Sequence, residues 1–478
     1  MNHLHGALAG IASGSVDHPP PVGRVQHVRL PSWVQAHLHP YAPLESPWVW
    51  RGFLGLTLLV IALLSWGAVR RRRTVAGRSG LRRWGARIVA SGVVVVLGLL
   101  TGLAFLNSYV GYFPTVASLA TVVVGGPSVP GSLSAATLGR RAGPHGDTLR
   151  IGETLPRHDS AVVAINIGAP KLRVPVRDAY VYLPPGYGDP ANARRRYPVV
   201  YLIHGFPGRP ADWMVAGGLP EVLNTLIADR QVGPMIVVAP NADGGYLHDS
   251  ECLNQVHGPQ VATYLTATVV HYIDTHFRTI ATRDGRAMGG ASSGGYCALN
   301  LGLLHQKEFS TIIAFEPYGD PGRSVIGPLL GGSQRLFQAN SPLSYLPSMH
   351  FAHRPAVFLD VGGAGSGEVG RVQSLVTLLE HRGVPIGFRV EPGQAHTWKE
   401  AVSGLPYGLF FAAHHLRAGL SYITTARHVA TVGGPAKNRT DGFARQYARD
   451  VARCQRLGAG YQPGGGKHGP QCVRADHD

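Results

Sequence analysis

The chain has few acidic residues and few cysteines, and it lacks the usual metal-binding and nucleic-acid-binding patterns. Its 478 residues include 27 Asp and Glu against 44 Lys and Arg, a formal net charge of +17. No C-x-x-C pair and no Cys/His cluster with metal-ligand spacing occurs, so neither a metal nor a cofactor is expected. No zinc-finger spacing, aromatic RNP signature or recognition-helix pattern accompanies the basic charge. Nucleic acid is therefore not expected as a partner.

The basic charge is concentrated near two apolar runs and in the C-terminal tail. Eight arginines lie between Arg70 and Arg87, with no acid among them. Uncharged runs of 18 to 19 residues flank this cluster at Gly52 to Val69 and Ile88 to Leu106. Each is long enough to cross a hydrocarbon core of about 30 Å, although a buried core helix is the alternative. The positive-inside rule places the arginine loop in the cytoplasm and the rest of the chain outside the plasma membrane.

The remaining pattern divides the chain into expected regions. They are an extracytoplasmic leader at 1–47, two transmembrane helices within 48–110 joined by the arginine-rich cytoplasmic loop 70–87, a linker at 111–146, a catalytic domain at 147–420 and a basic extension at 421–478. In the catalytic domain, short apolar runs bounded by Gly and Pro alternate with longer amphipathic segments. This alternation is typical of an α/β sheet.

The stretch 288–296 organises the catalytic domain. Gly290 to Gly294 reads G-x-S-x-G, a sharp strand-to-helix turn that exposes a serine hydroxyl. An apolar strand pattern precedes it and a helical pattern follows, which is the context this turn requires. Glycine is expected on both sides because a side chain there would hit the neighbouring strand or helix. Ser292 is the candidate nucleophile.

A serine nucleophile needs a base, and the base needs an acid to orient it. His396 is the candidate base, because it follows the last predicted strand in the order nucleophile, acid, histidine of α/β-hydrolases. Glu368 is the first candidate acid, as the only carboxylate in the loop predicted at 362–368. Asp360, inside the preceding strand, is the alternative acid, and Glu380 on the following predicted helix is a third possibility.

Two loops are expected to complete the site. The oxyanion hole requires two backbone N–H groups, assigned to Phe206 and Ser293. His204 and Gly205 are candidate substrate-binding residues in the same Gly-rich loop, although His204 could simply order that loop.

The four cysteines all follow the second apolar run, which suits an oxidising compartment. An even number allows two disulfides. We predict the pairs Cys252 with Cys297 and Cys454 with Cys472 among three possible connectivities. Free or buried thiols are the alternative.

The elements YPVVYLIHGFPG, GGASSGGYCAL and GQAHTW resemble the esterase D and antigen 85 branch of the α/β-hydrolases over about Asp178 to Leu416. The resemblance implies a mostly parallel eight-stranded sheet flanked by helices and acyl-ester chemistry through Ser292, an acid and His396. The sequence lacks the branch's usual G-x-x-D spacing before Glu368. Asp243 lies in a loop that either contacts substrate or forms a disulfide-pinned turn.

Three functions follow from this reading. The first is a membrane-anchored extracytoplasmic serine esterase acting on an acyl ester through an acyl-enzyme. The second is an acyltransferase with the same residues, similar to the mycolyltransferases of this branch, which move acyl chains between envelope glycolipids. The third is a catalytically silent binding domain, which the presence of all three motif loops disfavours.

Overall fold

A computed structural model describes residues 25–38, 42–72, 80–123, 133–134, 140–143, 146–149, 155–243, 248–417, 461–466 and 469–474. The chain forms two compact units, Met1–Ser421 and Tyr422–Asp478. In the second unit the described residues form an antiparallel hairpin of β13 (Tyr461–Gly466) and β14 (Gly469–Arg474). All other elements below belong to the first unit.

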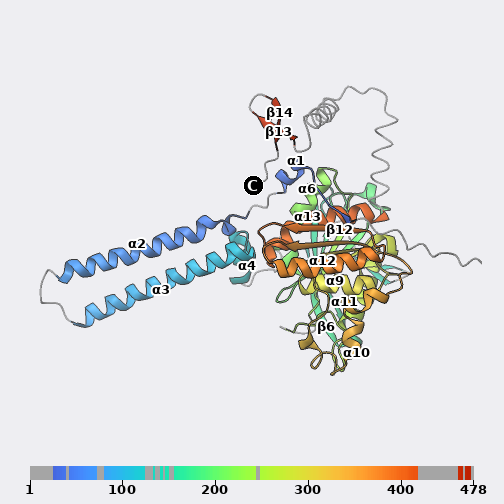
Figure 1. The fold of residues 1–478 in the computed structure, drawn as a ribbon, viewed down its shortest axis with the longest axis horizontal. Coiled ribbons are helices and arrows are strands. Elements are labelled where there is room, and N and C mark those ends of the chain that lie inside the picture. Colours follow the sequence, from blue (N-terminus) through green and yellow to red (C-terminus); the bar gives the residue numbers. More distant parts are fainter. Residues whose placement is uncertain are drawn as a thin grey trace, which may run out of the picture. The chain divides into compact units, whose positions relative to one another are not determined.

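Two long apolar helices precede the sheet. They are α2 (Pro47–Arg72) and α3 (Gly80–Val110), which lie side by side as a hairpin (Figure 1). Within them, Pro47–Gly67 and Arg87–Val110 are long and apolar enough to cross a membrane. Most of their described apolar side chains are exposed. Thr57 and Thr101 join the two helices through their hydroxyl groups at 3.4 Å.

A mostly parallel sheet carries the fold, as the sequence predicts. Its order is β1-β12-β11-β10-β9-β7-β8-β6-β5-β2, where β6 is antiparallel to both of its neighbours and the other pairs are parallel. The eight longer strands are β5 (Ala161–Ala169), β6 (Val174–Leu183), β7 (Val199–Ile203), β8 (Ile236–Pro240), β9 (Arg286–Ala291), β10 (Thr311–Phe315), β11 (Ala356–Gly362) and β12 (Ile386–Glu391). Two-residue strands β1 (Val25–Gln26) and β2 (Leu133–Ser134) extend its edges.

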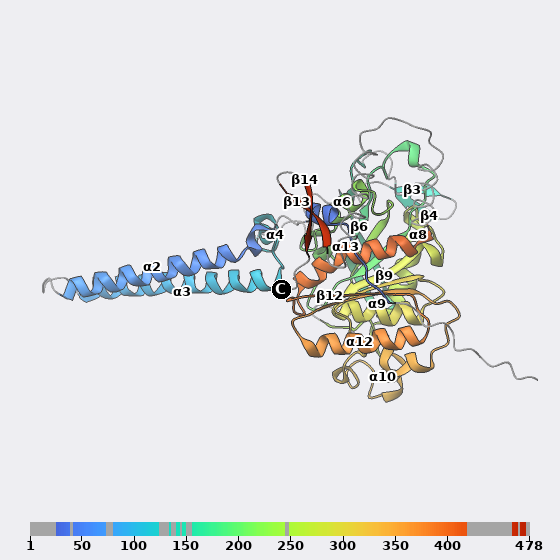
Figure 2. The same cartoon turned by 45° about the horizontal axis from the view of Figure 1, so that its top comes forward.

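Helices cover both faces of this sheet, because the side chains of each strand alternate between two hydrophobic clusters. In β10, for example, Ile312 and Ala314 join one cluster while Ile313 and Phe315 join the other. The first face carries α8 (Val270–His276), α9 (Ser293–Leu304) and α12 (Ser366–His381), and the second carries α6 (Leu219–Ala228) and α13 (Trp398–His415) (Figure 2). The short helix α5 (Ala211–Val215) also packs on the second face.

Shorter elements complete the description. They are α1 (Ser32–His37), α4 (Val116–Val123), α7 (Val261–Thr263), a π-helical turn η4 (Tyr264–Val269), α10 (Gln334–Ala339), α11 (Pro342–Tyr345) and a hairpin of β3 (Arg140–Gly143) and β4 (Gly146–Leu149). Three-residue 3-10 turns occur at Pro43–Glu45, Pro170–Leu172, Pro190–Asn192, Arg283–Gly285, Arg323–Val325 and Leu346–Ser348.

The described residues near the end of the predicted leader (1–47) pack against the sheet. Val25 pairs with Ile386 at the open edge of β12. Leu30 and Val34 are buried in the hydrophobic cluster beneath α13. Two effects therefore order residues that show little periodicity in sequence. The edge of β12 accepts one more strand, and the apolar side chains are buried.

Candidate active site

Ser292 occupies a sharp turn between β9 and α9. Its φ of 56° lies in the left-handed region, which is unusual for a non-glycine residue. Both flanking glycines are sterically required, as the sequence predicts. A Cβ on Gly290 would lie 2.2 Å from the carbonyl oxygen of Gly294, and a Cβ on Gly294 would lie 2.4 Å from that of Ile203.

His396 reaches Ser292 from the loop between β12 and α13. Its Nε2 lies 2.9 Å from the Ser292 Oγ, an ordinary hydrogen-bond distance. The histidine side chain is 36% exposed. Ser292 and His396 are 104 residues apart in sequence, but the carboxyl ends of parallel strands meet at one edge of the sheet. The serine hydroxyl can therefore pass its proton directly to the imidazole.

Two carboxylates face the other ring nitrogen of His396. Glu316 Oε2 and Glu368 Oε1 each lie 3.5 Å from His396 Nδ1. The sequence prediction included Glu368 but missed Glu316. Glu368 itself lies in the first turn of α12, which begins at Ser366, so the loop expected at 362–368 is shorter than predicted. The described contacts of Glu380 do not reach His396.

Asp360, the alternative acid, is fully buried in β11 and forms an ion pair with Arg389 at 2.7 Å. Burial raises its pKa to about 7 although Arg389 lowers it. Its carboxylate packs against α13, where a Cβ on Gly404 would lie 1.9 Å from Asp360 Oδ2. Asp360 therefore pairs inside the sheet, and its described contacts do not include His396.

The loop that is predicted to supply the N–H of Phe206 to an oxyanion follows β7 and lies against Ser292. A Cβ on Gly205 would lie 3.4 Å from the Ser292 Cβ. The N–H of Ala242 donates to His204 Nε2 at 3.1 Å, so the proton is on Nδ1, which donates to the Gly205 carbonyl at 2.8 Å. Since a trans peptide directs its C=O and N–H to opposite sides, the N–H of Phe206 points away from His204. Buried His204 thus orders the loop.

Ser293, the second predicted oxyanion donor, is the first residue of α9. Its N–H therefore has no acceptor within the helix, and the positive end of the helix dipole lies there. Asp243 lies three residues after the end of β8, and burial raises its pKa. Residues 244–247 of the same loop lie outside the described part of the chain. Contact of His204, Gly205 or Asp243 with a substrate stays a prediction.

The disulfide Cys252–Cys297 connects this loop region to α9, five residues after the nucleophile, with a Cα–Cα distance of 5.7 Å. Beside it, Tyr318 donates a hydrogen bond to Glu251 Oε2 at 2.6 Å. Burial, and then the charge of Asp249, raise the pKa of Glu251 to about 8. The predicted pair of Cys454 with Cys472 is untested, because Cys454 lies outside the described residues.

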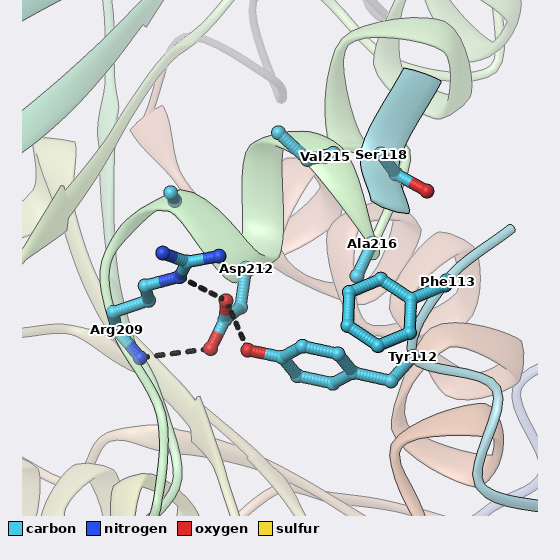
Figure 3. A pocket seen from close by; sticks show the side chains of 8 residues that line it. Tyr112, Phe113, Ser118, Arg209, Asp212, Val215 and Ala216 are labelled. Carbon is cyan, nitrogen blue, oxygen red and sulfur yellow. Dashed lines mark hydrogen bonds and ion pairs between the residues drawn. The ribbon is translucent and has the colours of Figure 1, made fainter. Parts of the chain in front are cut away.

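The segment that follows α3 contacts α5, next to the loop after β7 (Figure 3). Tyr112 donates a hydrogen bond to Asp212 Oδ1 at 2.7 Å, while Asp212 Oδ2 accepts the backbone N–H of Arg209 at 2.8 Å. Together with Phe113 and neighbouring residues they line a small pocket. The segment predicted as a linker at 111–146 therefore begins with a defined contact to α5.

Among the described residues, Glu316, Glu368 and His396 also place donor atoms within 4.8 Å of one another, close enough to surround a metal ion. His396 uses its second nitrogen toward Ser292. A base oriented by carboxylates and hydrogen-bonded to a strained serine is the arrangement of a nucleophilic hydrolase. The clustering of these three residues is thus explained by a serine hydrolase site without a metal ion.

Comparison with known proteins agrees with this arrangement. Residues 176–400 match the family model described as "Putative esterase". An uncharacterized protein of Corynebacterium glutamicum is 29% identical over 35% of this chain and 39% of its own length. An endo-1,4-beta-xylanase/feruloyl esterase of Xylanibacter ruminicola is 27% identical over 49% of this chain and 29% of its own.

Both alignments thus span well under half of the relatives' lengths. Among solved structures, a ferulic acid esterase is similar at 26% identity with a TM-score of 0.48, covering 54% of this chain and 99% of the esterase.

Proposed function

We propose that this chain is a serine hydrolase that cleaves carboxylic esters through an acyl-enzyme. The observation that carries the proposal is the 2.9 Å approach of His396 Nε2 to the hydroxyl of Ser292 at the strained turn. The match of residues 176–400 to the esterase family supports the same chemistry.

In the proposed reaction, the Ser292 Oγ attacks the ester carbonyl while His396 accepts its proton. The N–H groups of Phe206 and Ser293 stabilise the oxyanion, and the imidazolium then protonates the departing alcohol. Glu368 and Glu316 stabilise the imidazolium from the Nδ1 side. Water, activated by the same histidine, releases the acid and regenerates the serine.

The proposal includes an anchor in the plasma membrane with the catalytic domain on the extracytoplasmic side. Val25 contacts β12 and Tyr112 contacts Asp212 of α5, so both flanks of the α2–α3 hairpin meet the same domain. If the hairpin spans a membrane, the domain and both flanks lie on one side and the arginine-rich loop on the other. The positive-inside rule makes that loop cytoplasmic.

The test is labelling of the full-length, detergent-purified protein with a fluorophosphonate probe, together with hydrolysis of p-nitrophenyl esters. We expect both signals in the wild type and neither in Ser292→Ala. A folded wild type without labelling would contradict the proposal and favour a silent binding domain. Product analysis with and without trehalose distinguishes hydrolysis from acyl transfer, since both use the same acyl-enzyme.

A further inference from the structure

We propose that Glu316 is the carboxylate that orients His396, and that Glu368 is a secondary, solvent-facing neighbour of the same ring nitrogen. Both carboxylates stand 3.5 Å from His396 Nδ1, so distance alone does not separate them. What separates them is how firmly each is held. The inference rests on the proposed function and assigns a positioning residue to it.

Glu316 is fixed by the sheet itself. It follows β10 directly, and its backbone N–H donates to the Asp360 carbonyl at 2.8 Å. Its Oε1 accepts the backbone N–H of Gly362 at 2.9 Å, which leaves Oε2 toward His396. A Cβ on Gly362 would lie 2.5 Å from the Gln394 carbonyl oxygen and 2.9 Å from this Oε1, so position 362 requires glycine. The Glu316 side chain is only 3% exposed.

The backbone at Glu316 adopts a strained conformation that usually requires glycine. Its φ of 49° lies in the left-handed region, which costs a non-glycine residue of order 1 kcal/mol or more. Of the described residues near His396, Ser292 is the other non-glycine with positive φ at a strand end. Such strain persists where the surrounding structure imposes it, and at these two positions it aims a side chain at the histidine.

Glu368 is held less firmly. Its side chain is 30% exposed, and it has a second partner in Arg371 at 3.7 Å, itself 65% exposed. Both residues lie on the first turns of α12. An exposed ion pair of this kind contributes about 0–1 kcal/mol and fixes a side chain poorly. Water also screens its interaction with the imidazole.

Two other buried acids, Asp360 and Glu400, lie near Glu316. Asp360 pairs with Arg389, and Arg389 also pairs with Glu391. Glu400, in the first turn of α13, is fully buried, and neither carboxyl oxygen has an assigned hydrogen-bond partner among the described residues. Burial raises the pKa of Glu400 well above its usual value, and the charges of Asp360 and Glu316 add to this. Burial also raises the pKa of Glu316, and the N–H of Gly362 and the charge of His396 oppose this rise. His396 is thus the cationic side chain that favours the ionised form of Glu316.

The experiment compares Glu316→Gln, Glu368→Gln and Glu316→Asp in the full-length protein purified in detergent. A Ser292-dependent turnover of p-nitrophenyl acetate in the wild type is required first, because its absence would refute the proposed function rather than this assignment. We expect Glu316→Gln to lower kcat about 100-fold or more, since an amide cannot stabilise the imidazolium. KM should change less than about twofold. Glu368→Gln should lower kcat less than about 10-fold.

Glu400→Gln is the matched control, because it makes the same change in the same buried cluster at a group whose raised pKa favours the neutral form. It should leave kcat unchanged. Glu316→Asp keeps the charge and should retain more activity than Glu316→Gln. A loss of kcat in Glu368→Gln larger than in Glu316→Gln would overturn the assignment. A loss of about 100-fold in the kcat of Glu368→Gln would also overturn the assignment, and this test remains valid even if Glu316→Gln does not fold.

Discussion

The helices α3 and α9 are both rich in apolar and small residues, yet they lie in opposite environments. In α9, Ser293 to Leu303 are all buried between the sheet and its neighbours. In α3, side chains such as Leu99, Leu103 and Phe105 are more than half exposed. Apolar composition thus shows that a helix must be shielded from water, but not whether protein or lipid shields it. The sheet supplies that cover for α9, and a bilayer is the cover that suits α2 and α3.

The largest expected effect comes from one methyl group added to α9. In Gly294→Ala, the new Cβ would lie 2.4 Å from the Ile203 oxygen and 2.5 Å from the His204 oxygen. Backbone cannot move aside cheaply, so we expect the free energy of unfolding to fall by about 3 kcal/mol or more, with loss of esterase activity. Urea unfolding and probe labelling measure both.

Gly98→Ala in α3 is the matched control, because no atom lies within 4 Å of the added Cβ. Its unfolding free energy should stay within about 0.5 kcal/mol of the wild type. Equal destabilisation by both substitutions would mean that α3 is packed as tightly as α9.

The second prediction tests what covers α3. Leu99→Asp places a charge in the centre of the proposed span, at a cost of about 3 kcal/mol in a membrane. We expect more of the protein to be released from membranes by alkaline carbonate, while the thermal unfolding of the α/β unit stays the same. A variant that stays in the membrane fraction but unfolds at a lower temperature would contradict a lipid cover.

The third prediction concerns a buried carboxyl group of the α/β unit, a kind of group that the α2–α3 hairpin is not expected to bury. Glu251 has a pKa raised to about 8 by burial. The folded state therefore binds its proton more tightly than the unfolded state, so its contribution is full below about pH 4.5 and is lost as pH rises toward 8. Between pH 5 and 8 the unfolding temperature of the wild type should fall about 4 °C more than that of Glu251→Gln.

Glu221→Gln, at an exposed position on α6, is the control and should follow the wild-type pH dependence. Differential scanning calorimetry at several pH values compares the three proteins. Parallel curves for wild type and Glu251→Gln would refute the raised pKa.

The smallest effect is expected at the contact that joins the two regions. Tyr112→Phe removes the hydrogen bond to Asp212 and should cost about 1 kcal/mol of stability. Because Asp212 also holds the backbone of Arg209, kcat should fall about twofold to fivefold with KM unchanged. Tyr109→Phe, at an exposed ring in α3, should change neither quantity. Activity equal to wild type in both variants would show that the contact does not position the loop after β7.

Much of the fold could be predicted because its signals are local. The strands around 199–203, 236–240 and 311–315 are continuous apolar runs, and the G-x-S-x-G turn carries its own steric requirement. The order of the remaining motifs then predicted His396. Glu316 was missed although it directly follows a predicted strand, because a lone carboxylate before a proline does not show which neighbouring loop it faces.

The sequence by itself determined the apolar spans, the α/β alternation, the nucleophile turn and the histidine, because each depends on residues adjacent in the chain. Only the tertiary structure decided which carboxylates meet His396. Asp360 and Glu316 end up with different partners because β10, β11 and β12 are neighbours in the sheet. In that register Asp360 lies beside Arg389, and the carboxyl end of β10 places Glu316 beside the histidine. Pairing between strands far apart in sequence is set by the packing of the whole sheet.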